Sequence, residues 1–244
     1  MSDLLQVAPS VLPLRLENVG FTVGNRAILQ GVTAVLDAGV RTIVLGANGA
    51  GKSVLLRICH GLLAPTTGRV RWNADAAVAA RRQAMVFQRP VMLRRSAEAN
   101  IAYALRLGGV PRARRRPQAR AALARVGLEG LATHAARTMS VGEQQRLALG
   151  RAWALRPEVL LLDEPTASLD PGAINAIEAI IEAMHAEGTK IVMVTHNLGQ
   201  ARRLGDEILF LHEGRLCERT PAERFFRRPD SAEAQRFLAG ELPW

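Results

Sequence analysis

The stretch GANGAGKS, residues 46–53, decides the fold of this 244-residue chain. It follows RTIVLG (41–46), a short apolar run typical of a buried strand, and precedes SVLLRICHGLL (53–63), which is apolar at helical spacing. A glycine-rich turn between a strand and a helix fits the pattern GxxxxGK[ST] in the context that this pattern requires. Its members are Gly46, Ala47, Asn48, Gly49, Ala50, Gly51, Lys52 and Ser53.

The residue types in this loop suit a chain of phosphate groups. Glycines let the backbone turn so that its N–H groups face an anion, and the following helix adds the positive end of its dipole. Lys52 is one of only two lysines beside thirty arginines. A compact ammonium can lie between two phosphates. A guanidinium is bulkier and planar, so its donors point in two directions and it fits this position less well. Because the Ser53 hydroxyl suits Mg²⁺, we predict a site that binds the phosphates of a nucleotide together with Mg²⁺.

The segment VLLLDEP (159–165) supplies the second half of this expected site. Its four apolar residues indicate a buried strand that delivers Asp163 to the carboxyl end of the sheet, where ligands bind in open α/β folds. We expect Asp163 to hold Mg²⁺ through water. Glu164 points in a different direction, and we expect it to polarise a water molecule that attacks the γ-phosphate.

The rest of the chain alternates short apolar strands with helices, which predicts an α/β fold with a parallel sheet covered on both faces. Residues 13–23 are predicted to form an edge strand that pairs with 26–36 across a Gly24–Asn25 turn. Residues 89–150 are rich in Ala, Arg and Leu and predict an inserted helical block. The other expected elements are strands at 68–73, 83–88, 159–163 and 190–196, a helix at 177–188 and a hairpin at 207–219.

Composition narrows the class of protein without deciding it. The net charge is +10, which suits nucleic acid, an anionic membrane surface or phosphate-rich ligands. The densest basic cluster, RARRRP (112–117), has no aromatic residue for base stacking, so we interpret it as a solvated surface. Cys59 and Cys217 predict neither a disulfide framework nor a zinc site. No run is long enough to span a membrane, and residues 1–10 do not resemble a signal peptide, so we expect a cytosolic protein or one that docks on a membrane from the cytosol.

The segment MSVGEQQRLALGRAWALRPEVLLLDEPTASLD (139–170) resembles the signature-to-D-loop region of ABC transporter ATPases. The other motifs of that family follow in the same order, and the resemblance runs from about residue 13 to the end of the chain. In VFQRP, Gln88 is similar to the Q-loop glutamine, and His196 in VTHN resembles the switch histidine. The signature positions are Ser140, Val141, Gly142 and Glu143, and Asp170 lies in the D-loop.

The resemblance implies a P-loop NTPase (RecA-like) core with an antiparallel β subdomain, formed by residues 1–88 and 151–244, and a helical subdomain at 89–150. It implies that two subunits sandwich two ATPs, so that the signature of each contacts the ATP bound by the other. His196 would contact the γ-phosphate and help to orient water. Gln88 would bind Mg²⁺ and link the site to the helical subdomain, which receives the membrane subunit in importers.

Three positions depart from the family pattern. Val141 replaces the first signature glycine and crowds the approach of phosphate. Val54 stands where a threonine is common, so one hydroxyl contact to the α-phosphate is missing. Val23 stands where most relatives have an aromatic residue that stacks on adenine, and Phe21 substitutes only partly. We therefore expect weakened adenine affinity, with similar affinities for ATP and GTP.

A cassette without fused membrane spans favours an importer at the cytoplasmic face of the inner membrane, with separate permease subunits and a solute-binding protein outside. Segments 56–72, 83–105 and 195–216 look similar to tungstate and phosphate oxyanion importers, and amino-acid import is the alternative. A nucleic-acid-associated soluble ABC ATPase is a second alternative. It requires basic residues interleaved with aromatics, and only 4% of the chain is aromatic, so no direct nucleic-acid partner is expected.

Overall fold

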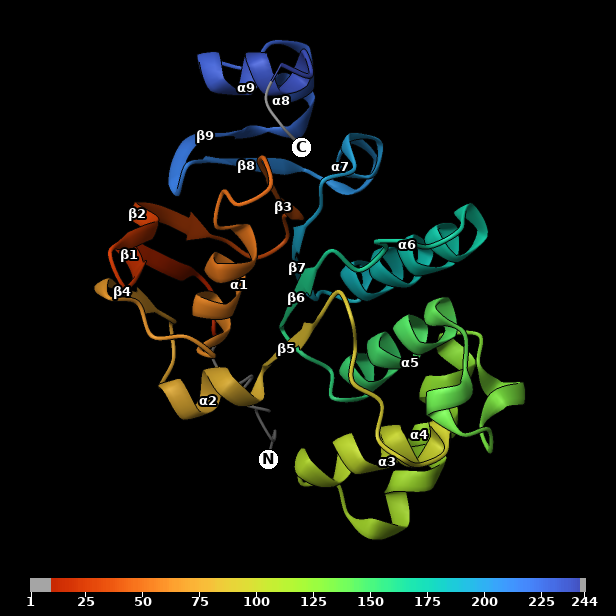
Figure 1. Cartoon of the computed structure of the whole chain (residues 1–244). Helices are drawn as coiled ribbons and strands as arrows, with labels where there is room; N and C mark the ends of the chain where they lie inside the picture. Colours follow the sequence, from red (N-terminus) through yellow and green to blue (C-terminus); the bar gives the residue numbers. More distant parts are fainter. Residues whose placement is uncertain (1–9, 242–244) are drawn as a thin grey trace, which may run out of the picture.

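A computed structural model describes residues 10–241, and its strands form two sheets (Figure 1). The smaller sheet is antiparallel, with the order β2-β1-β4. Its strands are β1 (Leu14–Val23), β2 (Arg26–Leu36) and β4 (Thr67–Arg71). The predicted pairing of the first two strands across the Gly24–Asn25 turn is confirmed. The prediction that residues 13–23 form an edge strand is wrong, because β4 pairs with the free side of β1.

The larger sheet has six strands in the order β5-β6-β7-β3-β8-β9. The first five are mutually parallel, and β9 runs antiparallel to β8. Its strands are β3 (Thr42–Leu45), β5 (Gln83–Val86), β6 (Val159–Asp163), β7 (Lys190–Val194), β8 (Glu207–His212) and β9 (Arg215–Pro221). The strand that leads into the glycine-rich loop therefore lies inside the sheet, with β7 on one side and β8 on the other.

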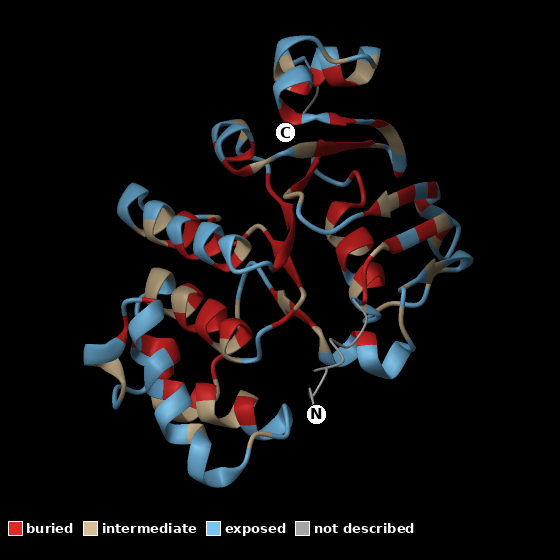
Figure 2. Cartoon of the chain, turned by 180° about the vertical axis from the view of Figure 1, so that it is seen from behind, coloured by how far each residue is buried: buried red, intermediate tan, exposed pale blue. Residues whose placement is uncertain are grey.

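The parallel strands of this sheet are largely apolar, and core residues cover both of its faces (Figure 2). On β3, Ile43 and Leu45 pack into the core shared with the helices, whereas Val44 packs into the core shared with the smaller sheet. Side chains alternate across a strand, so one short strand contributes to both cores. The continuous apolar runs in the sequence reflect this burial.

Of the nine α-helices within residues 10–241, the longer ones were predicted from the sequence pattern and the short ones were not. The structure contains the predicted helix after the glycine-rich loop, the helical block and the helix at 177–188, which begins earlier because Asp170 caps it. The short helices were not predicted, since six or seven residues carry too little periodicity. The helices are α1 (Lys52–His60), α2 (Ala76–Arg81), α3 (Ala97–Leu107), α4 (Arg112–Arg125), α5 (Val141–Ala154), α6 (Pro171–Ala186), α7 (Leu198–Leu204), α8 (Ala222–Arg227) and α9 (Ala232–Leu238).

The basic cluster at 112–117 forms the first turns of α4, which includes Pro117. Arg112, Arg114 and Arg116 are exposed, in agreement with the predicted solvated surface. Arg115 is half-buried, and its Nε donates to the carbonyl of Val110 at 2.7 Å. Nε of Arg116 lies 3.0 Å from the Glu98 carboxylate, so the cluster is held at Arg115 and Arg116 and is open to solvent at Arg112 and Arg114.

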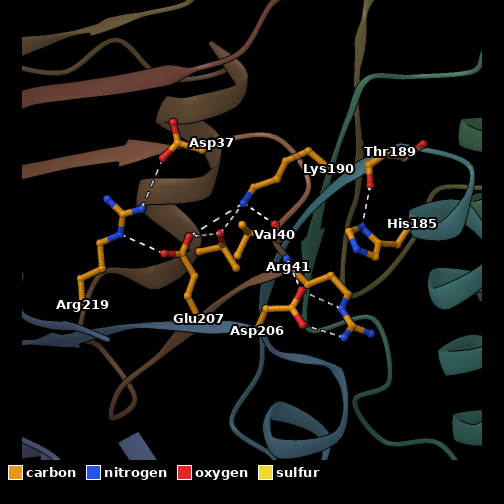
Figure 3. A network of polar contacts seen from close by, with 10 residues as sticks. Asp37, Val40, Arg41, His185, Thr189, Lys190, Asp206, Glu207 and Arg219 are labelled. Atoms are coloured by element: carbon orange, nitrogen blue, oxygen red, sulfur yellow. Dashed lines mark hydrogen bonds and ion pairs between the residues drawn. The ribbon is translucent and has the colours of Figure 1, made fainter. Parts of the chain in front are cut away.

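The second lysine of the chain, Lys190, is fully buried at the start of β7 (Figure 3). Its Nζ donates to the carbonyl of Val40 and to Oγ1 of Thr42, and lies 3.9 Å from the Glu207 carboxylate. The Thr42 hydroxyl donates in turn to Glu207 at 2.5 Å. Burial lowers the pKa of Lys190 from 10.5 to about 8, although the Glu207 carboxylate opposes this shift.

Cys59 is buried and Cys217 half-buried, and both thiols are free. Burial raises the pKa of Cys59 to about 12, so this thiol is unreactive. Within residues 10–241, no cluster of three or more His, Cys, Asp or Glu side chains is placed to hold a metal ion. In the same range no helix has the length and apolarity needed to cross a membrane. Residues 1–9, which hold most of the segment considered for a signal peptide, lie outside the described residues.

Candidate functional site

The glycine-rich loop joins the end of β3 to the start of α1, as predicted. Gly46, Gly49 and Gly51 have φ values of 151°, 80° and 94°, which side-chain-bearing residues rarely adopt. A Cβ at Gly46 would overlap the carbonyl oxygen of Leu211. At Gly51 it would lie 2.6 Å from the Leu29 side chain. Glycine is therefore required at both positions by conformation and by close packing.

Lys52 begins α1, and its side chain folds back over the loop. Its Nζ donates to the carbonyl oxygens of Gly46 and Ala47, at 2.7 and 2.9 Å, and the residue is buried. Burial lowers its pKa, while the nearby Glu164 and Asp163 carboxylates act in the opposite direction. A small cation thus lies inside a loop that is shaped for an anion.

Ser53 and Asp163 come from different elements and meet beside this cation. The Ser53 hydroxyl donates to Oδ1 of Asp163 at 2.6 Å, and Asp163 is buried at the end of β6. A hydroxyl and a carboxylate are oxygen ligands of the kind that Mg²⁺ accepts together with substrate phosphates. The protein groups present therefore fit the predicted Mg²⁺ site.

Arg57 also approaches Asp163, and none of the sequence motifs predicts it as a site residue. Its Nη2 lies 3.8 Å from Oδ2 of Asp163. Arg57 is one helical turn after Ser53 on α1, so the two side chains lie on the same helix face. The i, i+4 spacing from Ser53 was the available signal.

Glu164 lies next to Asp163 but points elsewhere, as predicted. Its φ is 47°, a strained value for a residue other than glycine, and its N–H donates to the carbonyl of Val194 at 3.0 Å. The Gln88 amide donates to its Oε2 at 3.4 Å, and Nδ1 of His196 lies 3.1 Å from the same oxygen. The structure therefore brings three of the predicted site residues together at one carboxylate.

The loop that carries Gln88 is attached to α5, the helix that begins with the signature. Nε2 of Gln145 donates to the carbonyl of Phe87 at 3.3 Å, and Nη1 of Arg151 donates to that of Val91 at 2.8 Å. Both donors project from α5 and hold the two sides of the Gln88 loop. A displacement of α5 would therefore be transmitted to Gln88.

The signature residues form the N-terminus of α5. Ser140 caps the helix, and the Glu143 carboxylate accepts from the N–H and the hydroxyl of Ser140 at 2.8 and 2.9 Å. These hydrogen bonds, first that from the Ser140 N–H, lower the pKa of Glu143. Gly142 is half-buried, whereas the Val141 side chain is 60% exposed and unpacked.

Asp170 caps α6, because its Oδ1 accepts from the N–H of Ala173 at 3.0 Å. Asp170 and the signature border one cavity of about 410 Å³. The residues that line this cavity include none from the phosphate loop. A single copy therefore presents the signature and the phosphate loop at separate places.

Val23 and Phe21, the two residues expected to lie beside the nucleobase, differ in how far they are exposed to solvent. Val23 is 60% exposed at the end of β1, whereas Phe21 is half-buried and packs against the core under the smaller sheet. Val54, which stands where a threonine is common, is also half-buried and packs against that core. Its side chain therefore contributes apolar contacts and has no hydroxyl to offer a phosphate. Among the described residues, no Phe, Tyr or Trp side chain lines the cavity beside the phosphate loop.

Comparison with solved structures identifies the fold. An ATP-binding subunit of an ABC transporter superposes with a TM-score of 0.81 at 27% identity, covering 93% of this chain and all of that one. A dimeric ATP-binding cassette, MJ0796, bound to ADP and Pi superposes with a TM-score of 0.75 at 28% identity, covering 86% and 98% of the two chains. The P-loop NTPase fold with its antiparallel sheet is thereby confirmed.

Comparison of sequences identifies the family. Residues 29–167 match the family model described as ABC transporter. The tungstate uptake system ATP-binding protein TupC of Peptoclostridium acidaminophilum is 37% identical, over 88% of this chain and the full length of the relative. The phosphate import ATP-binding protein PstB 2 of Natronomonas pharaonis and the methionine import ATP-binding protein MetN of Caulobacter vibrioides are each 36% identical over 88% of this chain, covering 82% and 68% of their own lengths. The chain therefore belongs to the ABC transporter family and is one of its ATPases.

Proposed function

We propose that this chain is the ATP-hydrolysing subunit of an ABC importer that drives uptake of a solute through a separate permease. The observation that carries the proposal is the convergence of Gln88 and His196 on the Glu164 carboxylate, beside the Ser53–Asp163 pair and Lys52. These side chains provide a cation for phosphate, oxygen ligands for Mg²⁺ and a carboxylate for water in one place.

The residues divide the work of hydrolysis among them. When bound, Mg²⁺ neutralises charge on the β- and γ-phosphates. Lys52 leaves the carbonyls of Gly46 and Ala47 for phosphate oxygens, while Ser53 and Asp163 hold the Mg²⁺ side of the site. Glu164 accepts a hydrogen bond from the attacking water and orients it. His196 supports this carboxylate and contacts the γ-phosphate, and Gln88 completes the Mg²⁺ surroundings.

A homodimer completes the site. Because the signature lies in a different cavity from the phosphate loop, one copy offers the N-terminus of α5 to the nucleotide held by the other. Helix N-termini attract anions, and the Ser140 hydroxyl is a suitable donor. ATP then holds two copies together, and hydrolysis releases them.

Residues 89–150 are proposed to act as the helical subdomain that responds to nucleotide, with the core at 1–88 and 151–244. The boundary at 150 falls inside α5, which runs to Ala154. The contacts of Gln145 and Arg151 with the Gln88 loop give this subdomain a mechanical connection to the ATP site.

An apolar groove of about 390 Å³ between β5, α3 and α5 is the proposed docking place for the permease. Val91 and Leu107 at this groove are 74% and 68% exposed, which is unusual for apolar side chains without a partner. Residues 89–150 contain twelve arginines and three acidic residues, a net charge of +9 out of +10 for the whole chain. This charge would favour an anionic membrane surface, consistent with a peripheral position on the cytoplasmic face of the inner membrane.

For the solute we favour an oxyanion such as tungstate or phosphate, with methionine or another amino acid as the alternative. Relatives named for tungstate uptake, phosphate import and methionine import have nearly equal identities to this chain. The solute-binding protein outside the membrane would make the selection, since the residues described above are proposed to act on the nucleotide and the permease.

The proposal is tested by purifying the chain in mild detergent from its native membrane and identifying the proteins that accompany it. The expected result is a multispanning permease, with a solute-binding protein encoded beside it. The thermal stability of that binding protein would then be measured with tungstate, phosphate and methionine. Co-purification of ribosomes or nucleic acid in place of a permease would contradict the assignment to an importer.

A further inference from the structure

The turn between β1 and β2 places a cation where the nucleobase lacks its aromatic partner. Val23 and Arg26 are paired directly across the antiparallel strands, on either side of the two-residue Gly24–Asn25 turn. Side chains of directly opposed residues lie on the same face, with Cβ atoms about 5 Å apart. Arg26 is therefore the neighbour of Val23 at the open end of this sheet.

Arg26 borders a cavity that reaches the phosphate loop. The cavity has a volume of about 480 Å³, and Asn48, Gly49 and Ala50 form the loop side of it. Ile28 and Ala27 line the β2 side together with Arg26. A nucleotide whose phosphates lie on the loop can extend its base along this cavity toward the turn.

The Arg26 guanidinium is free to bind a ligand. It is exposed, and within residues 10–241 it forms no ion pair with a carboxylate. The other long cation of the cavity, Arg236, lies 3.7 Å from Glu241 and is thus already paired. Glu213 also lines the cavity, and its backbone carbonyl accepts from the Gln30 side chain at 2.9 Å.

We propose that Arg26 is the nucleobase platform of this ATPase, in the place of the missing aromatic ring. A guanidinium is planar and weakly hydrated, and it stacks on aromatic faces. Arg26 therefore binds either purine, and the site does not select strongly for ATP over GTP. This inference rests on the proposed nucleotide site.

The test separates binding of the base from binding of the phosphates. Calorimetry would give the dissociation constants of Mg²⁺ complexes of ATP, GTP and inorganic tripolyphosphate, which has no base. The proteins are the wild type, Arg26→Ala, Arg26→Lys and the matched control Arg15→Ala. Arg15 is an exposed arginine of the same strand pair that does not line the cavity. Thermal midpoints of all four proteins would verify that they are folded.

Arg26→Ala is expected to weaken ATP and GTP binding about fivefold to tenfold, and tripolyphosphate binding less than twofold. Arg26→Lys keeps the charge but loses the planar group, so it should behave like Arg26→Ala. Adding Val23→Tyr to Arg26→Ala should recover the lost affinity, because the ring supplies a new stacking surface. Arg15→Ala should bind all three ligands like the wild type.

Equal weakening of ATP and tripolyphosphate by Arg26→Ala would overturn the proposal, since it would place Arg26 on the phosphates. Unchanged ATP affinity would overturn it as well. Wild-type ATP affinity in Arg26→Lys would show that the positive charge alone supports binding, and it would contradict stacking of the guanidinium on the base. Each of these outcomes leaves the ATPase assignment intact, whereas a wild type that binds none of the three ligands would contradict the proposed function itself.

Discussion

Nδ1 of His196 lies 3.1 Å from a carboxylate oxygen of Glu164, although the two residues are 32 positions apart in the chain. Each follows a parallel strand, and Asp163 of β6 is paired with Val194 of β7. Adjacent parallel strands end at the same edge of a sheet, so residues just beyond their ends meet there. The sheet register thus brings the two groups proposed for catalysis into contact.

Replacing Glu164 with Gln is expected to lower ATP hydrolysis by a factor of about 10²–10⁴, because the amide cannot accept a proton from water. Nucleotide binding should persist, since Glu164 is not in the phosphate loop, and the ATP-bound dimer should become long-lived. Phosphate release and chromatography with Mg²⁺-ATP would measure these effects. Hydrolysis at the wild-type rate would show that another residue acts on the water.

Replacing Lys52 with Ala or with Arg is expected to weaken ATP binding at least tenfold. Alanine removes the cation, and the bulkier guanidinium does not fit the small buried space bounded by the Gly46 and Ala47 carbonyls. Calorimetry with Mg²⁺-ATP measures both variants. Wild-type affinity in Lys52→Arg would mean that charge alone matters at this position.

Much of the site can be predicted from the sequence because each motif lies at the end of a strand. The apolar runs before Gly46, Asp163 and His196 place these residues at one edge of a parallel sheet. The i, i+4 spacing indicates that Arg57 shares a helix face with Ser53, but its contact with Asp163 depends on the exact placement of α1 against β6. The strained φ of Glu164 is likewise invisible in the sequence, because tertiary packing imposes it.

The local parts of the fold are also predictable from the sequence, whereas the pairing of distant segments is not. Strand pairing across the Gly24–Asn25 turn is local and therefore evident, whereas the approach of β4 to β1 joins segments about fifty residues apart. The central position of β1 follows from that distant pairing, so local alternation could not distinguish it from an edge position. Helices as short as α7 (Leu198–Leu204) lack a full periodic pattern and depend on tertiary contacts.

Replacing Val141 with Gly is expected to tighten the ATP-bound dimer formed by the Glu164→Gln variant, because the exposed branched side chain no longer crowds the facing phosphate. Glycine in the first turn of α5 should lower the free energy of unfolding by about 0.5–1 kcal/mol. Dissociation of the dimer after dilution and chemical denaturation measure the two effects. A dimer that dissociates faster would show that Val141 contributes favourable contact.

Replacing Lys190 with Met is expected to remove a pH dependence of stability. The pKa of Lys190 is about 8 in the folded protein and 10.5 ordinarily, so between these values the unfolded chain binds more protons. The free energy of unfolding of the wild type should therefore rise with pH across this window, by about 3 kcal/mol relative to Lys190→Met. Denaturation at pH 7 to 10.5 measures the difference. A constant difference across that range would contradict the lowered pKa.

The central claim is that each ATP is held by the phosphate loop of one copy and the signature of the other. It is tested most directly by mixing Lys52→Ala with Ser140→Arg and measuring phosphate release. Each variant alone has two defective sites, whereas a head-to-tail heterodimer has one site with both defects and one intact site. The account predicts that the equimolar mixture hydrolyses ATP faster than the average of its components. No gain in rate, with mixed dimers verified by mass, would contradict it.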